Sequence, residues 1–216
     1  MSKIPATVVI LSFNSEATIA NTINSVLMFE HILVVDSGSS DGTLSILHNL
    51  PVEVINHDWE GYSQQRSFSL KHCRHEWVFQ LDSDEVAEAQ LIENIAECIK
   101  EDQAVGIRVR VRECFMGVLN VDMTKHCAKI RIFKRASARY QAVKAHEGVV
   151  VSGKILNAQG MIVHYGEHDI ATKISKINTY STLKSEEKFA QGQRPTLIRL
   201  LMICPLIFFQ SYIIRR

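Results

Sequence analysis

The segment WVFQLDSDE, residues 77–85, contains a short apolar run that ends abruptly in acidic residues. The run WVFQL, residues 77–81, is typical of a central strand in a parallel sheet. Asp82 and Asp84 follow at alternate positions, and Glu85 comes next. Ligands of open α/β sheets bind beyond the carboxyl ends of the strands, and hard divalent cations take oxygen ligands. This strand end is therefore a candidate cation site, although D-S-D-E also suits an acidic loop that caps the following helix.

The stretch before this segment alternates between strand and helix patterns. Apolar runs without polar interruption predict buried strands, and apolar residues at helical spacing predict the helices between them. Four such units indicate a doubly wound, mostly parallel sheet with helices on both faces. The expected strands cover residues 7–12, 31–35, 52–55 and 77–81, and the expected helices cover residues 17–28, 43–50, 62–73 and 88–100.

The pattern changes after residue 101. Apolar and polar residues alternate over 105–112 and 129–134, which predicts strands with one exposed face. A short run at 161–163 is a further strand, and residues 170–188 form a helix that we expect to turn Ile174, Ile177 and Leu183 inward. The second half is thus predicted to complete the sheet and to form the far wall of a cleft.

The composition is that of a globular protein with one sizeable core: 216 residues, 46% hydrophobic and 22% charged. The formal net charge of +1 favours no particular partner, and no nucleic-acid partner is expected. The five cysteines form no C-x-x-C pair, which indicates reduced thiols in the cytoplasm. The apolar run near the N-terminus is too short for a signal peptide and is better interpreted as the first strand.

The segment DSGSSDGT, residues 36–43, follows the second predicted strand. An acid there, Asp36, can accept hydrogen bonds from a ribose hydroxyl or a uracil N–H, whereas Asp41 suits a turn and helix cap. The segment lacks both the dinucleotide-binding fingerprint and the P-loop pattern. Neutralisation of a diphosphate would then fall to a metal and a basic group. Arg66 is the nearest candidate, with a solvated helix arginine as the alternative.

The successive segments LSFNSEATIANTINSV, LVVDSGSSDGT and EGYSQQRSFSLKHCRHEWVFQLDSDE resemble, in order and spacing, the motifs of glycosyltransferase family 2. The later segments KAHEGV, residues 144–149, and HYG with KINTYST, within residues 164–182, resemble the lipopolysaccharide-core β-glucosyltransferases of Gram-negative bacteria. The resemblance implies a GT-A fold, a UDP-sugar donor and inversion at the anomeric carbon. It also implies one domain over residues 1–190, with a nucleotide-binding half (1–101) and an acceptor-binding half (102–190).

The resemblance also implies roles for particular residues. Asp84 would bind the divalent cation, Mg²⁺ or Mn²⁺, and His164 could complete the metal site or meet a phosphate. Glu147 would be the catalytic base, with His146 orienting it or serving as a core histidine. The sequence departs from the family pattern at Gln65-Arg66-Ser67, where Ala-Arg-Asn is usual, and at His146-Glu147, where Glu-Asp is usual. The residues expected to bind the nucleotide-sugar are Ser12, Asn14, Glu16, Asp36, Gly38, Arg66, Asp82 and Ser83.

Two further features have alternative interpretations. Arg108, Arg110 and Arg112 form either a solvated strand face or a contact to acceptor phosphates. Residues 197–214 within the tail (191–216) are nearly all apolar and are flanked by arginines. They suggest a helix lying in the interface of an anionic membrane, or else a helix packed on the core or in an oligomer contact.

The expected activity is metal-dependent, inverting transfer of a sugar, with glucose as the expected sugar, from a UDP-sugar to a lipopolysaccharide inner-core or related acceptor. The expected location is the cytoplasm, peripherally on the inner face of the cytoplasmic membrane. The alternatives are a nucleotidyltransferase acting on a sugar phosphate and a catalytically inactive nucleotide-sugar-binding scaffold. A phosphatase with an aspartate nucleophile is disfavoured, since its D-x-D would follow the first strand.

Overall fold

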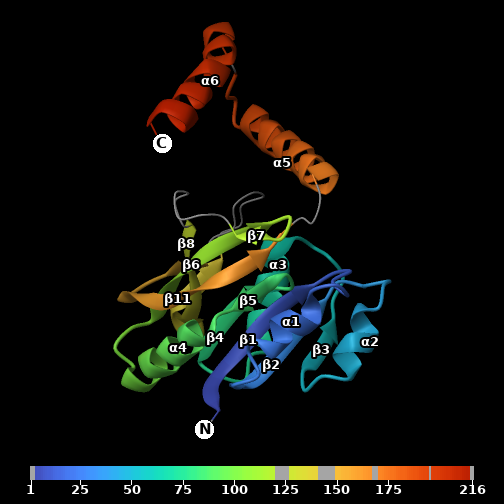
Figure 1. Ribbon diagram of the computed structural model, residues 1–216. Coiled ribbons are helices and arrows are strands. Elements are labelled where there is room, and N and C mark those ends of the chain that lie inside the picture. The colour runs from blue at the N-terminus through green and yellow to red at the C-terminus, as the bar shows by residue number, and fades with distance from the viewer. Residues whose placement is uncertain (1–2, 120–126, 141–148, 167–169, 195, 215–216) are drawn as a thin grey trace.

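The computed structural model describes residues 3–119, 127–140, 149–166, 170–194 and 196–214. Figure 1 shows a twisted sheet with helices on both faces, from which the two C-terminal helices stand apart. The first half alternates strand and helix as predicted. Its elements are β1 (Ile4–Ser12), α1 (Ile19–Asn24), β2 (Phe29–Asp36), α2 (Thr43–His48), β3 (Glu53–Asn56), α3 (Tyr62–Lys71), β4 (Trp77–Asp82) and α4 (Ala89–Glu101).

The parallel part of the sheet has the strand order β3-β2-β1-β4. Its central strand β1 is buried on both faces, because α1, α2 and α4 cover one face and α3 covers the other. Val8 and Ile10 lie in the larger core with those three helices, and Val9 lies in the smaller core beside residues of α3. Burial on both faces explains why residues 8–11 of β1 are all apolar.

The second half extends this sheet with antiparallel and parallel neighbours. Beyond β4 the order continues β8-β6-β11-β5, with β7 on β6, and β9 pairs with β10 in a separate ribbon. The alternation predicted for residues 105–112 is confirmed, because Ile107, Val109 and Val111 are buried and Arg108 and Arg110 are exposed. The elements are β5 (Glu85–Ala87), β6 (Gly106–Phe115), β7 (Val118–Leu119), β8 (Cys127–Lys134), η1 (Arg135–Ser137), β9 (Ala138–Tyr140), β10 (Val149–Val151) and β11 (Ile155–Tyr165).

The segment after Asp84 is more ordered than a capping loop. Residues 85–87 form β5, which pairs antiparallel with β11, so that His164 lies opposite Glu85. The backbone N–H of Glu88 donates to the carbonyl of Met161 at 3.1 Å, and α4 begins directly afterwards. The segment that directly follows the predicted strand 77–81 therefore contacts β11, which lies at the far side of the sheet.

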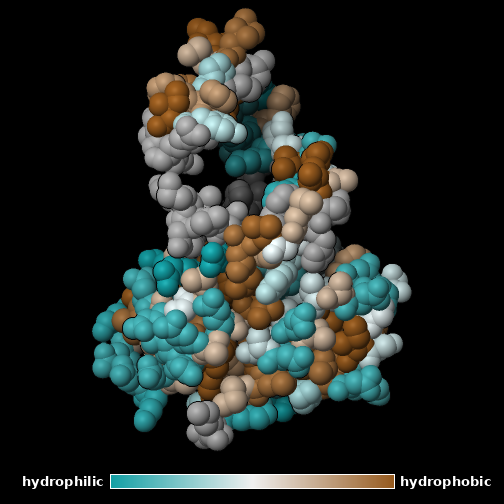
Figure 2. Space-filling model, viewed as in Figure 1, coloured by the Kyte–Doolittle hydropathy of each residue, from teal (hydrophilic) through white to brown (hydrophobic). Residues whose placement is uncertain are grey.

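The C-terminal part consists of α5 (Ile170–Ala190), α6 (Leu197–Phe209) and the π-helical turn η2 (Gln210–Ile214). The prediction that Ile174 and Ile177 face inward is wrong, since they are 53% and 56% exposed. Figure 1 shows the reason, because α5 stands clear of the sheet and its helices. Apolar side chains lie on the surface of this part in Figure 2. No helix among the described residues combines the length and apolarity needed to cross a membrane.

The division of the chain at residues 101 and 190 stays a prediction. The fold class is as expected: a mixed, mostly parallel sheet in its first half, with helices on both faces.

Candidate active site

The loop after β2 is folded around the carboxylate of Asp36. This side chain is fully buried, and its Oδ1 accepts hydrogen bonds from the backbone N–H groups of Gly38 (3.0 Å) and Ser39 (2.8 Å). The Ser39 hydroxyl donates to Oδ2 at 2.6 Å. Gly38 has φ +85°, a conformation that favours glycine, and no neighbouring atom would meet an added Cβ. Asp36 therefore shapes the turn, and its contact with a ligand stays a prediction.

The loop after β1 is joined to this turn by two of the predicted site residues. The side-chain oxygen of Asn14 accepts from the backbone N–H of Ser40 at 2.8 Å, and Asn14 itself has φ +48°. Glu16 accepts from the backbone N–H of Gly42 at 2.6 Å. Because Ser12 and Asp36 are also aligned across β1 and β2, the two loops form one platform at the carboxyl edge of the sheet.

The end of β4 is attached to the same platform through Ser83. Its hydroxyl shares a hydrogen bond with the Ser15 hydroxyl at 2.7 Å, and its carbonyl accepts from Thr22 at 2.9 Å. The Ser12 hydroxyl is buried and has no hydrogen-bond partner among the described residues. The structure thus brings together the loop residues predicted on β1, β2 and β4.

Asp82 lies between two arginines. Arg66 Nη2 donates to its Oδ1 at 2.6 Å, and Arg131 Nη2 donates to its Oδ2 at 3.3 Å. Burial by itself raises the pKa of Asp82, but the charges and hydrogen bonds of Arg131 and Arg66 outweigh it and hold that pKa far below its usual range. Asp82 is therefore ionised, and its 39% exposed side chain reaches the surface between the two cations.

Arg131 is a site residue that the sequence analysis missed. Its guanidinium also pairs with Glu85, whose side chain is only 2% exposed, and Glu85 accepts a further hydrogen bond from the backbone N–H of Asp82 at 2.9 Å. The alternating pattern of residues 129–134 predicted a strand but not which face is buried. The one available signal was the acid at Glu85, since a buried carboxylate requires a cation as partner.

Asp84 and His164, the two predicted metal ligands, lie next to each other, and their role in metal binding stays a prediction. His164 Nε2 lies 3.1 Å from Asp84 Oδ2, and its Nδ1 lies 2.8 Å from Glu113 Oε2. Burial lowers the pKa of His164, but the hydrogen bonds and charges of Asp84 and Glu113 outweigh it and raise that pKa to about 10. His164 is therefore an imidazolium held between two carboxylates. No cluster of three or more His, Cys, Asp or Glu side chains in the described part of the chain is arranged to hold a metal by itself.

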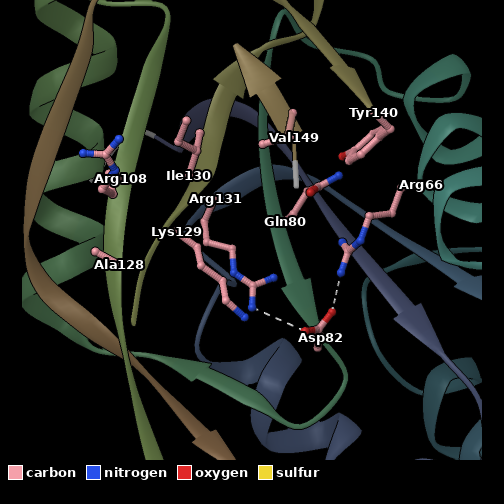
Figure 3. Close-up of a pocket in the computed structure, with 10 residues that line it drawn as sticks. All are labelled: Arg66, Gln80, Asp82, Arg108, Ala128, Lys129, Ile130, Arg131, Tyr140 and Val149. Carbon is pink, nitrogen blue, oxygen red and sulfur yellow. Dashed lines mark hydrogen bonds and ion pairs between the residues drawn. The ribbon is translucent and has the colours of Figure 1, made fainter. Parts of the chain in front are cut away.

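A pocket of about 300 Å³ opens beside Asp82. Figure 3 shows Arg66, Gln80 and Tyr140 on one side of it, Arg131 and Lys129 on the other, and Asp82 below them. The predicted base Glu147 and its neighbour His146 lie outside the described residues. The complete lining is Arg66, Gln80, Asp82, Arg108, Ala128, Lys129, Ile130, Arg131, Tyr140 and Val149.

Known proteins resemble this chain over most of its length. Residues 7–155 match the family described as "Glycosyl transferase family 2". The lipopolysaccharide core biosynthesis glycosyltransferase LpsC of Rhizobium meliloti is 32% identical over 219 residues, which are 97% of this chain and 81% of that protein. An uncharacterized glycosyltransferase of Rickettsia typhi is 30% identical over 221 residues, which are 96% of this chain and 76% of that protein.

Solved structures support the fold. TarS of S. aureus has a TM-score of 0.55 and 16% identity, over 76% of this chain and 36% of that one. TarS 1–349 in complex with UDP-GlcNAc has a TM-score of 0.54 and 17% identity, over 78% of this chain and 60% of that one. The predicted GT-A architecture is confirmed by this likeness together with the family match. The chain belongs to glycosyltransferase family 2.

Proposed function

We propose that this transferase moves a sugar from a UDP-sugar to a lipopolysaccharide inner-core acceptor or a related glycan or lipid. The proposed sugar is glucose, and the transfer inverts the anomeric carbon. The observation that carries the proposal is the position of Asp82 and Asp84 at the carboxyl end of β4, beside the joined loops of β1 and β2. Ligands of α/β sheets bind at such an edge. The similarity to LpsC, a lipopolysaccharide core glycosyltransferase, supports the acceptor class, and the TarS complex supports the donor class.

The nucleotide lies, in this proposal, on the platform formed by Ser12, Asn14, Glu16, Asp36 and Gly38, with Ser83 beside it. Arg66 lies at its border, where its guanidinium faces the donor's diphosphate while holding Asp82 through Nη2. Asp82 then lies near the ribose or the sugar. Fixed by two arginines, it needs no rearrangement when the donor binds, which is the kind of preorganisation that catalytic sites use.

The residues present fit a divalent cation, Mg²⁺ or Mn²⁺, at Asp84 and His164. A carboxylate oxygen and an imidazole nitrogen lie 3.1 Å apart, so that a cation could take the place of the proton between them. Glu113 holds the other ring nitrogen, an arrangement typical of metal-bound histidines. When bound, the cation supplies Lewis acidity toward the leaving diphosphate. The remaining ligands would come from donor phosphates and water, as is usual for Mg²⁺.

Glu147 is the proposed general base, with His146 to orient it. The residues that flank the segment 141–148 are Tyr140 and Val149, which pair in the β9–β10 ribbon and line the pocket. The carboxylate of Glu147 would take the proton of the acceptor hydroxyl while that oxygen attacks the anomeric carbon. The bond from the anomeric carbon to the diphosphate breaks, and UDP leaves from the opposite face.

Donor binding and turnover test this function together. A thermal-melt screen across UDP- and GDP-sugars should show the largest rise in midpoint with the true donor, because a ligand that binds only the folded state stabilises it. Hydrolysis of that UDP-sugar should require Mg²⁺ or Mn²⁺ and stop in excess EDTA. Release of pyrophosphate from a nucleoside triphosphate and a sugar phosphate would instead identify a nucleotidyltransferase. Donor binding without any turnover would identify a scaffold.

We also propose that α6 and its flanks lie on an anionic membrane, which would place the enzyme on the inner face of the cytoplasmic membrane. Apolar side chains cover α6, where Leu197, Ile198 and Leu201 are 72%, 76% and 66% exposed. The sequence carries five basic residues and no acidic one over residues 188–216. Exposed apolar area with adjacent cations is typical of interfacial helices.

Flotation with liposomes tests the membrane proposal. Full-length protein should float with anionic liposomes at low salt and should not float with neutral liposomes. The floating fraction should fall as the salt concentration rises, because salt screens the electrostatic part of the attraction. A chain that ends at Arg194 should not float but should still bind UDP. The membrane proposal fails if the full-length chain does not bind anionic liposomes and the shortened chain no longer binds UDP. The tail would then be part of the folded core.

A further inference from the structure

The pocket beside Asp82 contains hydrogen-bond donors that nothing in the described chain uses. Arg66 Nη1, Gln80 Nε2 and Arg131 Nε are buried and have no hydrogen-bond partner among the described residues. Their residues are 9%, 3% and 6% exposed, and all three line the pocket. A buried hydrogen-bond donor without a partner is costly. A site that gathers three such donors is therefore suited to a ligand that brings hydrogen-bond acceptor atoms.

The charge of the pocket favours an anion. Its lining carries four cations, Arg66, Arg108, Lys129 and Arg131, and one carboxylate, Asp82. Counting Glu85, which pairs with Arg131 behind the lining, the cations still outnumber the carboxylates by four to two. Both oxygens of the Asp82 carboxylate are already engaged by Arg66 and Arg131. Guanidinium groups match the geometry of phosphate and carboxylate oxygens, and such charge-assisted hydrogen bonds are among the stronger ones.

The position of these cations separates them from the nucleotide platform. Lys129 and Arg131 lie two residues apart on β8, and Arg108 on β6 pairs with Ile130 between them, next to a register shift that leaves Arg131 without a paired residue on β6. In the sheet order, β8 and β6 lie on the opposite side of β4 from β1 and β2. The pocket thus extends from Asp82 toward β8 and β6, away from the platform, and Arg66 lies at the border between the two.

Size and reaction geometry agree with a second substrate. A volume of 300 Å³ is at the lower end of the range for small-molecule pockets, so it suits one sugar unit with an anionic group rather than a whole nucleotide-sugar. In an inverting displacement the attacking hydroxyl and the departing diphosphate lie on opposite faces of the sugar ring. The group that fills this pocket is therefore on the side of the acceptor.

We propose that this pocket is an anion subsite for the acceptor, which receives a phosphate or carboxylate group on the acceptor sugar through Arg131, Lys129, Arg108 and the amide of Gln80. The inference rests on the proposed function, because it takes the platform as the site of the UDP-sugar. It adds that the acceptor is acidic and that a neutral sugar is a poor substitute.

The test uses the full-length protein, labelled with ¹⁵N in its arginine side chains and saturated with UDP. Mannose 6-phosphate, glucuronate and mannose are titrated in turn, and the arginine Nε–H signals report binding. Mannose 6-phosphate carries a phosphate and glucuronate carries a carboxylate, so comparing them shows which anion the pocket binds. Mannose is the uncharged control. We expect a charged sugar to shift the Arg131 signal in the presence of UDP, and mannose to leave it unchanged.

Lys129→Ala should raise the dissociation constant of the charged sugar about tenfold, the loss expected for one partly exposed charged contact, and leave UDP affinity within about twofold. Lys129 is exposed, so its truncation should not disturb folding. Arg110→Ala is the matched control, because Arg110 is also exposed on β6 but does not line the pocket. It should change neither affinity by more than about twofold.

Displacement of the charged sugar by UDP would assign the pocket to the donor's diphosphate and overturn the proposal. Equal binding of mannose, an unaffected Lys129→Ala variant, or no binding of either charged sugar would overturn it as well. Failure of UDP to bind the wild-type protein would instead refute the proposed function. The titrations without UDP would still decide whether the pocket takes an anion.

Discussion

Removal of Arg131 should destabilise the protein strongly, because it leaves the buried carboxylate of Glu85 without its cation, whatever else Arg131 binds in the pocket. The side chains of Arg131 and Glu85 are 7% and 2% exposed, and their ion pair is directly hydrogen-bonded. Truncating one partner of a buried pair costs roughly 3–5 kcal/mol, since the remaining charge stays desolvated. For a domain of this size the melting temperature should fall by about 6–20 °C. Arg131→Met tests this while it preserves the apolar volume.

The double variant Arg131→Met with Glu85→Gln is the decisive control. It removes both charges, while the glutamine oxygen can still accept the hydrogen bond that Glu85 receives from the backbone N–H of Asp82. Most of the lost stability should therefore return, because replacing a whole buried pair by neutral groups is often nearly neutral. Arg131→Lys should fall between the wild type and Arg131→Met, since lysine keeps the charge but its ammonium does not occupy the position from which Nη2 contacts both Glu85 and Asp82.

The assay is denaturant unfolding followed by circular dichroism at pH 8 and pH 5. Burial already raises the pKa of Glu85 in the folded protein although Arg131 lowers it, so removal of Arg131 should raise that pKa further. The folded variant then binds the proton more tightly than the wild type does, and its stability deficit shrinks in acid. The deficit of Arg131→Met should thus be smaller at pH 5 than at pH 8. Equal deficits for the single and double variants at both pH values would refute the idea that Arg131 neutralises Glu85.

Three further predictions concern the chemistry of the site. Asp84→Ala should abolish turnover and metal-dependent UDP binding while the fold is retained, with a stability loss no larger than that of His164→Gln, and near-normal activity in excess EDTA would remove the metal from the mechanism. Glu147→Gln should lower kcat by roughly 10²-fold or more with little change in donor affinity. If the Glu147→Gln variant is active and the Asp122→Asn or Glu113→Gln variant is inactive, the base is another carboxylate. His164 should titrate in NMR with a pKa of about 10. Its folded pKa exceeds the unfolded value, so its contribution to stability is complete below about pH 6.5 and is lost as the pH rises through 10. His164→Gln should therefore cost more stability at pH 6 than at pH 10.5, and a deficit independent of pH would contradict the two ion pairs.

The local sequence determined the framework of this protein. The apolar runs before Ser12, Asp36 and Asp82 predicted the parallel strands, because a strand buried on both faces tolerates few polar residues. Since the carboxyl ends of parallel strands share one edge, the same runs also predicted that the loops after them would meet. Hydrogen bonds from the Ser40 N–H to Asn14 and between Ser15 and Ser83 confirm that meeting.

Only the tertiary structure decided which distant groups share one environment. Arg131 reaches Asp82 and Glu85, and His164 reaches Asp84 and Glu113, because antiparallel strands late in the chain pair back onto β4 and β5. Alternation along a strand shows that two faces differ, but it does not show which face a neighbouring element will cover. The same limit explains the tail. Ile174 and Ile177 have the spacing of a packed helix, but burial requires a partner surface, and none of the described elements lies against them.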